Sequence, residues 1–284
     1  MTPAIRLAYT VMSPEAQHYQ DTAYDGTFGD AIRRLAEIGY DGVEVQVATP
    51  AELDAERLAA DLAGLGLAVA ALATGPLAAR GASMCEPDPR RRARVLEELQ
   101  TLVERAAVLG TRLSLGRILD NAPDRGVPRE ERLVRTAAML GVLADFAARQ
   151  GVRLLVEPQN GGTTDLVNTI DDAVDLITRT GRTNIGIIGD TYHLELTQGS
   201  AEEALRGAGP LLEHVQFGDT DRGRPGTAGM PFAAIVELLG ARGYDGWITL
   251  EHAQDAGERT AELAYEFTRA LVADDKTEAG EHVG

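Results

Sequence analysis

The sequence alternates between short apolar runs and longer segments of helical periodicity along almost all of its 284 residues. Short runs rich in Val, Ile, Leu and Ala predict strands, whereas apolar residues at every third or fourth position predict helices. The expected strands are 6–11, 42–47, 67–73, 112–118, 152–157, 184–189, 212–217 and 246–251. The expected helices are 28–38, 54–63, 88–109, 129–150, 169–180, 200–207, 231–241 and 256–273.

Strict alternation of this kind requires parallel strands joined by right-handed crossovers. Eight such units in roughly 250 residues favour a closed barrel over an open sheet. The fragment Gly-Tyr-Asp-Gly also recurs at 39–42 and 243–246, at the same helix-to-strand joint, as a cyclic architecture would produce. We therefore predict the α/β class and a single (β/α)8 TIM barrel over residues 1–273, with a disordered tail at 274–284. An open doubly wound sheet is the alternative, but no Gly-x-Gly-x-x-Gly motif follows the first strand.

Composition limits the partners of the chain. A formal charge of −17 argues against a nucleic-acid ligand, which would require a basic face. The single cysteine excludes an internal disulfide and suits a reducing compartment. We see no signal peptide and no apolar run of the roughly 20 residues that a membrane span requires. The sequence thus predicts a cytoplasmic protein that binds neither nucleic acid nor membrane.

Four side chains with oxygen ligands end the last four expected strands. They are Glu157, Asp190, Gln216 and Glu251. An acidic residue at a strand end can also be a helix N-cap or a solvated loop residue, so the prediction depends on the four together. Converging carboxylates repel one another in a site of low dielectric unless a cation is present. Hard oxygen ligands favour Mn²⁺ or Mg²⁺ over Zn²⁺, so we predict one such ion, with Co²⁺ as an alternative.

The barrel architecture would bring these four side chains together. The carboxyl ends of the strands in a β/α barrel share one face, where catalytic groups from several strands meet. The parity of strand 212–217 places His214 and Gln216 on one side and Val215 and Phe217 on the other. A long polar loop, 12–26, follows the first strand and is expected to lie over a site.

The chain resembles the sugar phosphate isomerases and epimerases of the xylose-isomerase-like TIM-barrel superfamily. The resemblance covers nearly the whole chain, and its most specific stretches are Glu157-Pro158-Gln159-Asn160, Asp190-Thr191-Tyr192-His193 and Pro225-Gly226-Thr227. In ketose 3-epimerases of this family a Glu, Asp, His, Glu set binds one Mn or Mg ion. The resemblance places these ligands at Glu157, Asp190, Gln216 and Glu251. The third is usually the second His of a His-x-His pair, but hydroxypyruvate-isomerase-like members place Gln there, which leaves His214 as a support.

The resemblance also implies roles for residues around the metal. His193 and Arg222 correspond to residues that contact the substrate, and both types donate hydrogen bonds to carbonyl and hydroxyl oxygens. One departure concerns the substrate itself. Epimerases of free ketohexoses commonly carry an Arg and an acidic residue where this chain has the segment 161–164, Gly-Gly-Thr-Thr. Contacts to the far hydroxyls must therefore differ.

We interpret the chain as a divalent-metal-dependent isomerase or epimerase of a keto-sugar or related keto-acid. Glu157 and Glu251 would serve as general base and acid, and the proton transfer would pass through a metal-bound enediolate. A metal-dependent lyase or dehydratase acting on a dehydroshikimate, keto-inositol or C-glycoside is the first alternative. A non-catalytic sugar-binding barrel is the second. An endonuclease is disfavoured by the acidic balance and by only five histidines.

Two expectations concern partners. We expect a small carbohydrate or keto-acid as substrate and a homo-oligomer, dimer or tetramer, as the assembly. Arg80 and Arg117 lie near the ends of the third and fourth strands, where either could meet a carboxylate or phosphate of the substrate.

Overall fold

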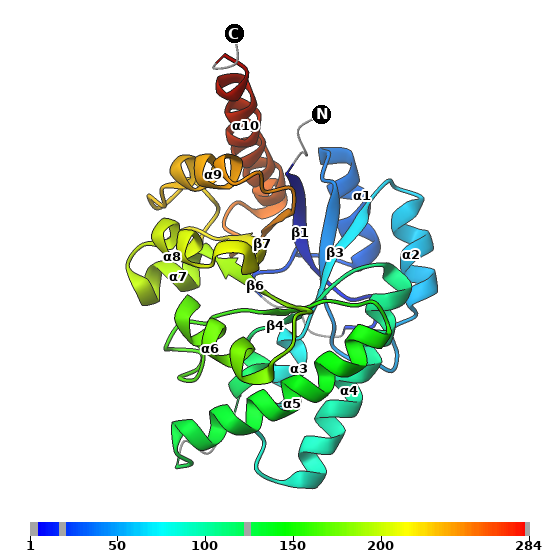
Figure 1. The fold of residues 1–284 in the computed structure, drawn as a ribbon. Helices are drawn as coiled ribbons and strands as arrows, with labels where there is room; N and C mark the ends of the chain where they lie inside the picture. The colour runs from blue at the N-terminus through cyan, green and yellow to red at the C-terminus, as the bar shows by residue number, and fades with distance from the viewer. Residues whose placement is uncertain (1–4, 17–20, 122–125, 282–284) are drawn as a thin grey trace.

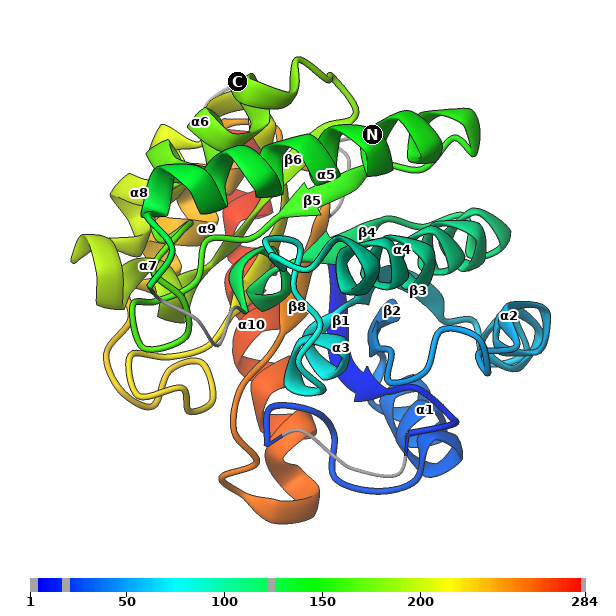
Figure 2. The same ribbon diagram turned by 90° about the horizontal axis from the view of Figure 1, so that it is seen from below.

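The computed structural model describes residues 5–16, 21–121 and 126–281, and of residues 274–281 it describes only the backbone. Within these ranges eight parallel strands close into a barrel in chain order, with helices around the outside (Figures 1 and 2). The strands are β1 (Arg6–Met12), β2 (Gly42–Gln46), β3 (Ala68–Ala73), β4 (Leu113–Leu115), β5 (Leu154–Val156), β6 (Ile185–Asp190), β7 (Leu212–Phe217) and β8 (Trp247–Leu250). The predicted (β/α)8 barrel is confirmed.

The helices of the described residues follow the strands and fill the connections. They are α1 (Phe28–Ile38), α2 (Ala55–Ala63), α3 (Gly75–Ala79), α4 (Pro89–Leu109), α5 (Arg129–Arg149), α6 (Ile170–Thr180), α7 (Thr191–Gln198), α8 (Ala201–Gly207), α9 (Phe232–Ala241) and α10 (Thr260–Glu281). Single 3₁₀ turns are η1 (Arg117–Asp120), η2 (Gly209–Leu211) and η3 (Gly257–Arg259). None of the described helices is long and apolar enough to cross a membrane.

Local signals fix the first helix as its sequence predicts. The Thr27 side chain accepts a hydrogen bond from the backbone N–H of Asp30, which caps the N-terminus of α1. Gly39 ends the helix with φ of 107°, in the left-handed region that glycine adopts without steric cost.

The structure differs from the predicted boundaries at three places. The fourth strand is much shorter than 112–118, because the chain turns at Gly116 into η1. The short helices α3 and α7 were not predicted, since each lies in a connection too brief to show helical periodicity. The last helix was expected to end at 273, yet the backbone of α10 continues to Glu281, and 282–284 lie outside the described residues.

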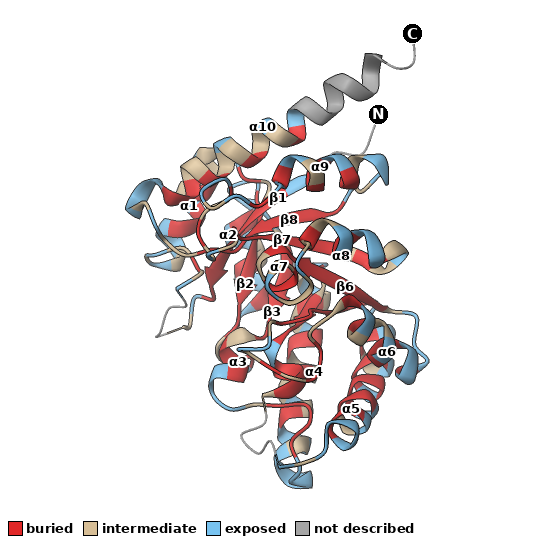
Figure 3. Ribbon diagram, turned by 90° about the vertical axis from the view of Figure 1, so that its left-hand side faces the viewer, coloured by how far each residue is buried: buried red, intermediate tan, exposed pale blue. Residues whose placement is uncertain are grey.

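Apolar burial has two parts. The large core lies between the strands and the inward faces of the helices, and the outward helix faces are exposed (Figure 3). A separate small cluster consists of Ala8 of β1, Ala70 of β3 and Trp247 of β8. Gly42 is required there, because a Cβ at this position would lie 2.7 Å from the Trp247 ring and 2.4 Å from a backbone oxygen of β3.

The strands also carry buried polar side chains, in contrast to an ordinary barrel core of branched apolar residues. They are Thr10, Glu44, Gln46, Ser114, His214, Gln216 and Thr249. Burying polar groups is costly unless they are paired. These polar side chains in the strands therefore indicate a functional site in the barrel.

Candidate metal centre

A cavity of about 440 Å³ opens where the four predicted ligands lie. Glu157, Gln216 and Glu251 line it, and Asp190 is fully buried beside them. Glu157 and Glu251 each follow directly after the last residue of β5 and β8. Asp190 and Gln216 are register partners near the ends of β6 and β7. The neighbouring strands thus deliver all four side chains to one face of the barrel.

Glu157, Asp190 and His193 form a compact group of potential ligands. One ligand atom from each lies within 4.8 Å of the other two. Asp190 caps α7 by accepting a hydrogen bond from the backbone N–H of His193, at 3.0 Å, which fixes one relative to the other. The Nδ1 atom of His193 accepts a hydrogen bond from the backbone N–H of Asn160, so Nε2 is the atom directed toward Glu157, 3.9 Å away. His193 was predicted as a substrate contact, and because Nδ1 accepts, the proton of the neutral ring lies on Nε2, where it can be donated into the site.

Gln216 has an oxygen that no group of the described residues satisfies. Its Nε2 donates to Glu44 at 2.8 Å, whereas its Oε1 is buried without a hydrogen-bond partner. Glu44 is itself fully buried, and the His214 Nε2 atom lies 3.2 Å from its other oxygen and 2.8 Å from Thr249 Oγ1. Because Glu44 engages the amide nitrogen, the amide oxygen is the free end of Gln216.

This donor set fits a hard divalent cation. Buried polar atoms normally have a partner, so the orphaned oxygen of Gln216 calls for one that the protein does not supply. Carboxylate and amide oxygens are the ligands that Mn²⁺ and Mg²⁺ prefer. Glu157, Asp190, Gln216 and Glu251 would hold the ion.

Arg222 links two of the predicted ligands. Its guanidinium donates to Asp190 at 2.7 Å and lies 3.4 Å from Glu251, and it stacks over the Tyr192 ring at 4.8 Å. Its backbone has φ of 66°, an unusual conformation for a residue with a side chain. Arg222 therefore lies inside the site rather than on an exposed loop.

Electrostatics in the site favour proton exchange. Burial, followed by the nearby charges of Glu251 and Asp190, raises the pKa of Glu157 well above its usual value. Burial also raises the pKa of Glu251 to about 8, although Arg222 opposes the shift. For Asp190 the effect of burial is outweighed by Arg222, which lowers the pKa. The pKa values in the site are thus shifted in opposite directions: that of Asp190 is lowered, and those of Glu157 and Glu251 are raised, which favours proton uptake by the two glutamates.

Neighbouring groups hold both glutamates in place. Gln159 Nε2 donates a short hydrogen bond to Glu157, and Thr22 Oγ1 donates to Glu251 at 3.3 Å. Gly116 is also needed, since a Cβ at that position would lie 2.4 Å from Glu157 Oε2. The contact from Thr22 brings part of the 12–26 loop over the site, as expected. Residues 17–20 of that loop lie outside the described residues.

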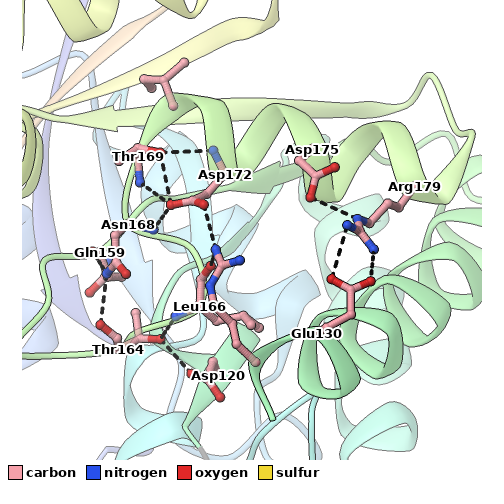
Figure 4. A network of polar contacts seen from close by, with 12 residues as sticks. Asp120, Glu130, Gln159, Thr164, Leu166, Asn168, Thr169, Asp172, Asp175 and Arg179 are labelled. Atoms are coloured by element: carbon pink, nitrogen blue, oxygen red, sulfur yellow. Dashed lines mark hydrogen bonds and ion pairs between the residues drawn. The ribbon is translucent and has the colours of Figure 1, made fainter.

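The loop after β5 is anchored by polar contacts that Figure 4 shows. Asn168 donates to the backbone oxygen of Gln159 at 2.6 Å, and Thr164 Oγ1 donates to Asp120 at 3.0 Å. Arg132, which is almost fully buried, pairs with the same aspartate at 2.6 Å. These contacts fix the segment that carries Gln159, and with it the side chain that holds Glu157.

Sequence reasoning missed several of these groups. Glu44 and Gln46 are two positions apart in the apolar run of β2, so both side chains point to the same side of the strand and both are buried. A charged residue within an apolar strand was the sequence signal that could have identified Glu44. Gln159 and Asn160 were part of a recognised motif, but nothing in the sequence gave their contacts.

Comparisons with known proteins agree with the barrel fold. Residues 32–271 match the family model described as xylose isomerase-like TIM barrel. An L-ribulose 3-epimerase of Mesorhizobium japonicum is 31% identical over 214 residues, which cover 75% of this chain and 71% of that protein. A 3-dehydro-D-guloside 4-epimerase of Escherichia coli is 28% identical over 231 residues, covering 78% and 86%. A solved structure of an L-ribulose 3-epimerase superposes with a TM-score of 0.79 at 25% identity, covering 99% of this chain and 98% of that one.

The chain belongs to the xylose isomerase-like TIM-barrel family. The resemblance seen in the sequence is thereby confirmed. The epimerases among its relatives also confirm the prediction that it is an enzyme of the isomerase and epimerase class.

Proposed function

We propose that this protein is a divalent-metal-dependent isomerase or epimerase of a keto-sugar or keto-acid. Its relatives act on carbohydrates, as their names state, which supports a carbohydrate substrate for this chain. The observation that carries the proposal is the pair of buried glutamates, Glu157 and Glu251, which line one cavity from two separate strands. Burial raises the pKa of both, that of Glu251 to about 8, as suits groups that accept and return a proton.

Each residue of the site has a role in this proposal. A bound divalent ion would supply Lewis-acid stabilisation of negative charge on the substrate's oxygens. Glu157 would remove the proton beside the carbonyl group and Glu251 would deliver or accept one from the other side. Arg222 and the Nε2–H of His193 would donate hydrogen bonds to substrate oxygens. Transfer between opposite faces gives an epimer, whereas transfer between adjacent carbons by one residue gives an aldose–ketose isomer.

The test is a screen of keto-sugars and keto-acids with Mn²⁺ or Mg²⁺ added, read by NMR. We expect at least one compound to be epimerised or isomerised, and chelation of the metal to abolish the reaction. A product that has lost water or an aglycone would establish the lyase alternative instead. Metal and sugar binding without turnover of any compound would favour a non-catalytic barrel.

We further propose a homo-oligomer, dimer or tetramer, and a cytoplasmic location. The family resemblance supports the homo-oligomer. The single cysteine, which is buried and forms no disulfide, supports the cytoplasmic location. Light scattering on the purified protein measures the assembly directly.

A further inference from the structure

The cavity at the metal centre extends well beyond the predicted ligands, toward the ends of β3 and β4. Its wall there consists largely of small residues, which leave room for the far part of a substrate. They are Ala73, Gly75, Ala79 and Gly116. The metal ligands lie on β5 to β8, so a substrate bound through its carbonyl end would extend toward this opposite side.

Arg117 lines this far part of the cavity. It makes no ion pair with the carboxylates of the described residues, whereas the other arginine of the cavity wall, Arg222, is engaged by Asp190 and Glu251. The other arginine that the sequence singled out, Arg80, pairs with Glu98 at 3.1 Å and is absent from the cavity wall. The structure thus separates two arginines that the sequence could not distinguish.

The position of Arg117 is built rather than accidental. The side chain is exposed, its Nε donates to Asn121 Oδ1 at 3.0 Å, and its two terminal nitrogens have no hydrogen-bond partner among the described residues. Asn121 is fixed in turn, because its own amide donates to a backbone oxygen of α3 and its N–H donates to Ser83. The same turn is anchored by the buried pair of Asp120 with Arg132.

We propose that Arg117 binds an anionic group, a carboxylate or a phosphate, at the end of the substrate remote from the reacting carbonyl. A planar guanidinium with two free nitrogens matches the oxygens of either group in a bidentate arrangement. The net charge of the molecule is strongly negative, so its surface repels anions. A guanidinium that makes no ion pair with a described carboxylate, that of Arg117, offers an anionic group an attractive partner inside the cavity. This inference rests on the proposed function, since it names the substrate class of the same site.

The experiment compares three matched ketoses that differ only at carbon 6. They are D-fructose, D-fructose 6-phosphate and D-fructuronate, and their affinities are measured by calorimetry on the Mn²⁺-loaded protein. We expect one of the two anions to bind about 10- to 100-fold more tightly than fructose, the range of charge-assisted hydrogen bonds. The preferred anion then distinguishes a phosphorylated sugar from a sugar acid.

Variants assign the effect to this arginine. Arg117→Gln should abolish the preference for the anion over fructose, whereas Arg117→Lys should keep part of it. Arg80→Gln is the matched control and should bind all three ligands as the wild type does. Equal affinity for the three ligands, absence of binding by either anion, or an anion preference that survives in Arg117→Gln would each overturn the proposal. Calorimetry reports the affinity whether or not the ligand reacts, so failure of the proposed reaction is seen separately, in the NMR screen.

Discussion

At the scale of single residues, the site depends on one amide whose two ends have different partners. Glu44 takes the nitrogen of Gln216 and leaves the oxygen free. A glutamine in water presents either end, so it is the buried glutamate, and not the glutamine alone, that defines the ligand. His214 contacts the same glutamate from one layer deeper, in agreement with its proposed role as a support.

Gln216→Leu should therefore weaken Mn²⁺ binding by at least about tenfold, because it removes the free oxygen. His214→Gln should leave the metal affinity within a few-fold of wild type and mainly lower the free energy of unfolding, by about 1–3 kcal/mol. Titration with Mn²⁺ followed by electron paramagnetic resonance measures the affinity of both variants. The reverse ranking would make His214 the ligand.

The sequence predicted the four ligands because each ends a recognisable strand. It could not predict Glu44, since its partner Gln216 lies 172 positions away in the chain. The contacts of Thr22 with Glu251 and of Arg222 with Asp190 could not be predicted either, because the closure of the barrel and the loop geometry bring these residues together. Long-range partners of this kind follow from the fold and have no local signature.

At the scale of elements, the loop between β7 and α9 is organised by one side chain. Asp219 is fully buried and accepts five backbone N–H groups. The donors are Thr220, Gly226, Thr227, Ala228 and Met230. This loop carries Arg222, so Asp219 fixes the arginine that pairs with Asp190. Burial alone would raise the pKa of Asp219, but these hydrogen bonds outweigh it and lower the pKa.

Asp219→Asn should lower the free energy of unfolding at pH 7 by at least about 2 kcal/mol, because several N–H groups lose a charged acceptor. A lowered pKa means that the stabilisation by Asp219 is fully present above the usual value of 3.8 and is lost as the pH falls through the folded-state pKa. The difference in free energy of unfolding between the wild type and Asp219→Asn should accordingly become smaller in acid. Urea unfolding followed by the fluorescence of Trp247 measures it.

Asp221→Asn is the control for this prediction. Asp221 lies in the same loop but, among the described residues, accepts one backbone N–H, that of Gly223 at 2.8 Å, so its effect should be small. If the loss of unfolding free energy in Asp219→Asn is the same at neutral and acid pH, the predicted coupling between stability and the ionisation of Asp219 is wrong.

The boundaries of elements show what local sequence does and does not determine. The start and end of α1 follow from Thr27 and Gly39, which act within one turn of the helix. The fourth strand is short because the chain turns at Gly116 into η1, where the apolar run of the sequence predicted that the strand would continue. The alternation of apolar runs was sufficient for the barrel, because eight repeated units leave few other topologies.

At the scale of the whole molecule, the barrel gathers four buried or nearly buried carboxylates, those of Glu44, Glu157, Asp190 and Glu251, and the guanidinium of Arg222 pairs with two of them. Their mutual repulsion opposes folding, and a bound cation relieves it. Metal binding to the folded chain should therefore raise its stability.

Mn²⁺ at one hundred times its Kd should stabilise the folded state by about 2.7 kcal/mol, through mass action alone. For a domain of this size that corresponds to a rise in Tm of about 5–10 °C. Differential scanning calorimetry with and without Mn²⁺, and after chelation, measures the shift. Zn²⁺ that binds stoichiometrically with no response to Mn²⁺ would contradict the assignment of a hard oxygen site.

The central claim is that two glutamates move a proton, and exchange of the substrate's α-proton with deuterated solvent tests it most directly. Glu157→Gln and Glu251→Gln each keep the shape and one oxygen ligand but lose most of the basicity. We expect both variants to retain weakened Mn²⁺ binding and to lose turnover by about 10²- to 10⁴-fold.

In a two-base epimerase, one of the two variants should still exchange the α-proton, because removal from one face survives without delivery to the other. NMR of the substrate in deuterated water, for the wild type and both variants, records exchange and turnover in the same sample. If both variants bind Mn²⁺ and turn over near the wild-type rate, the glutamates are ligands alone and the account of proton transfer is wrong.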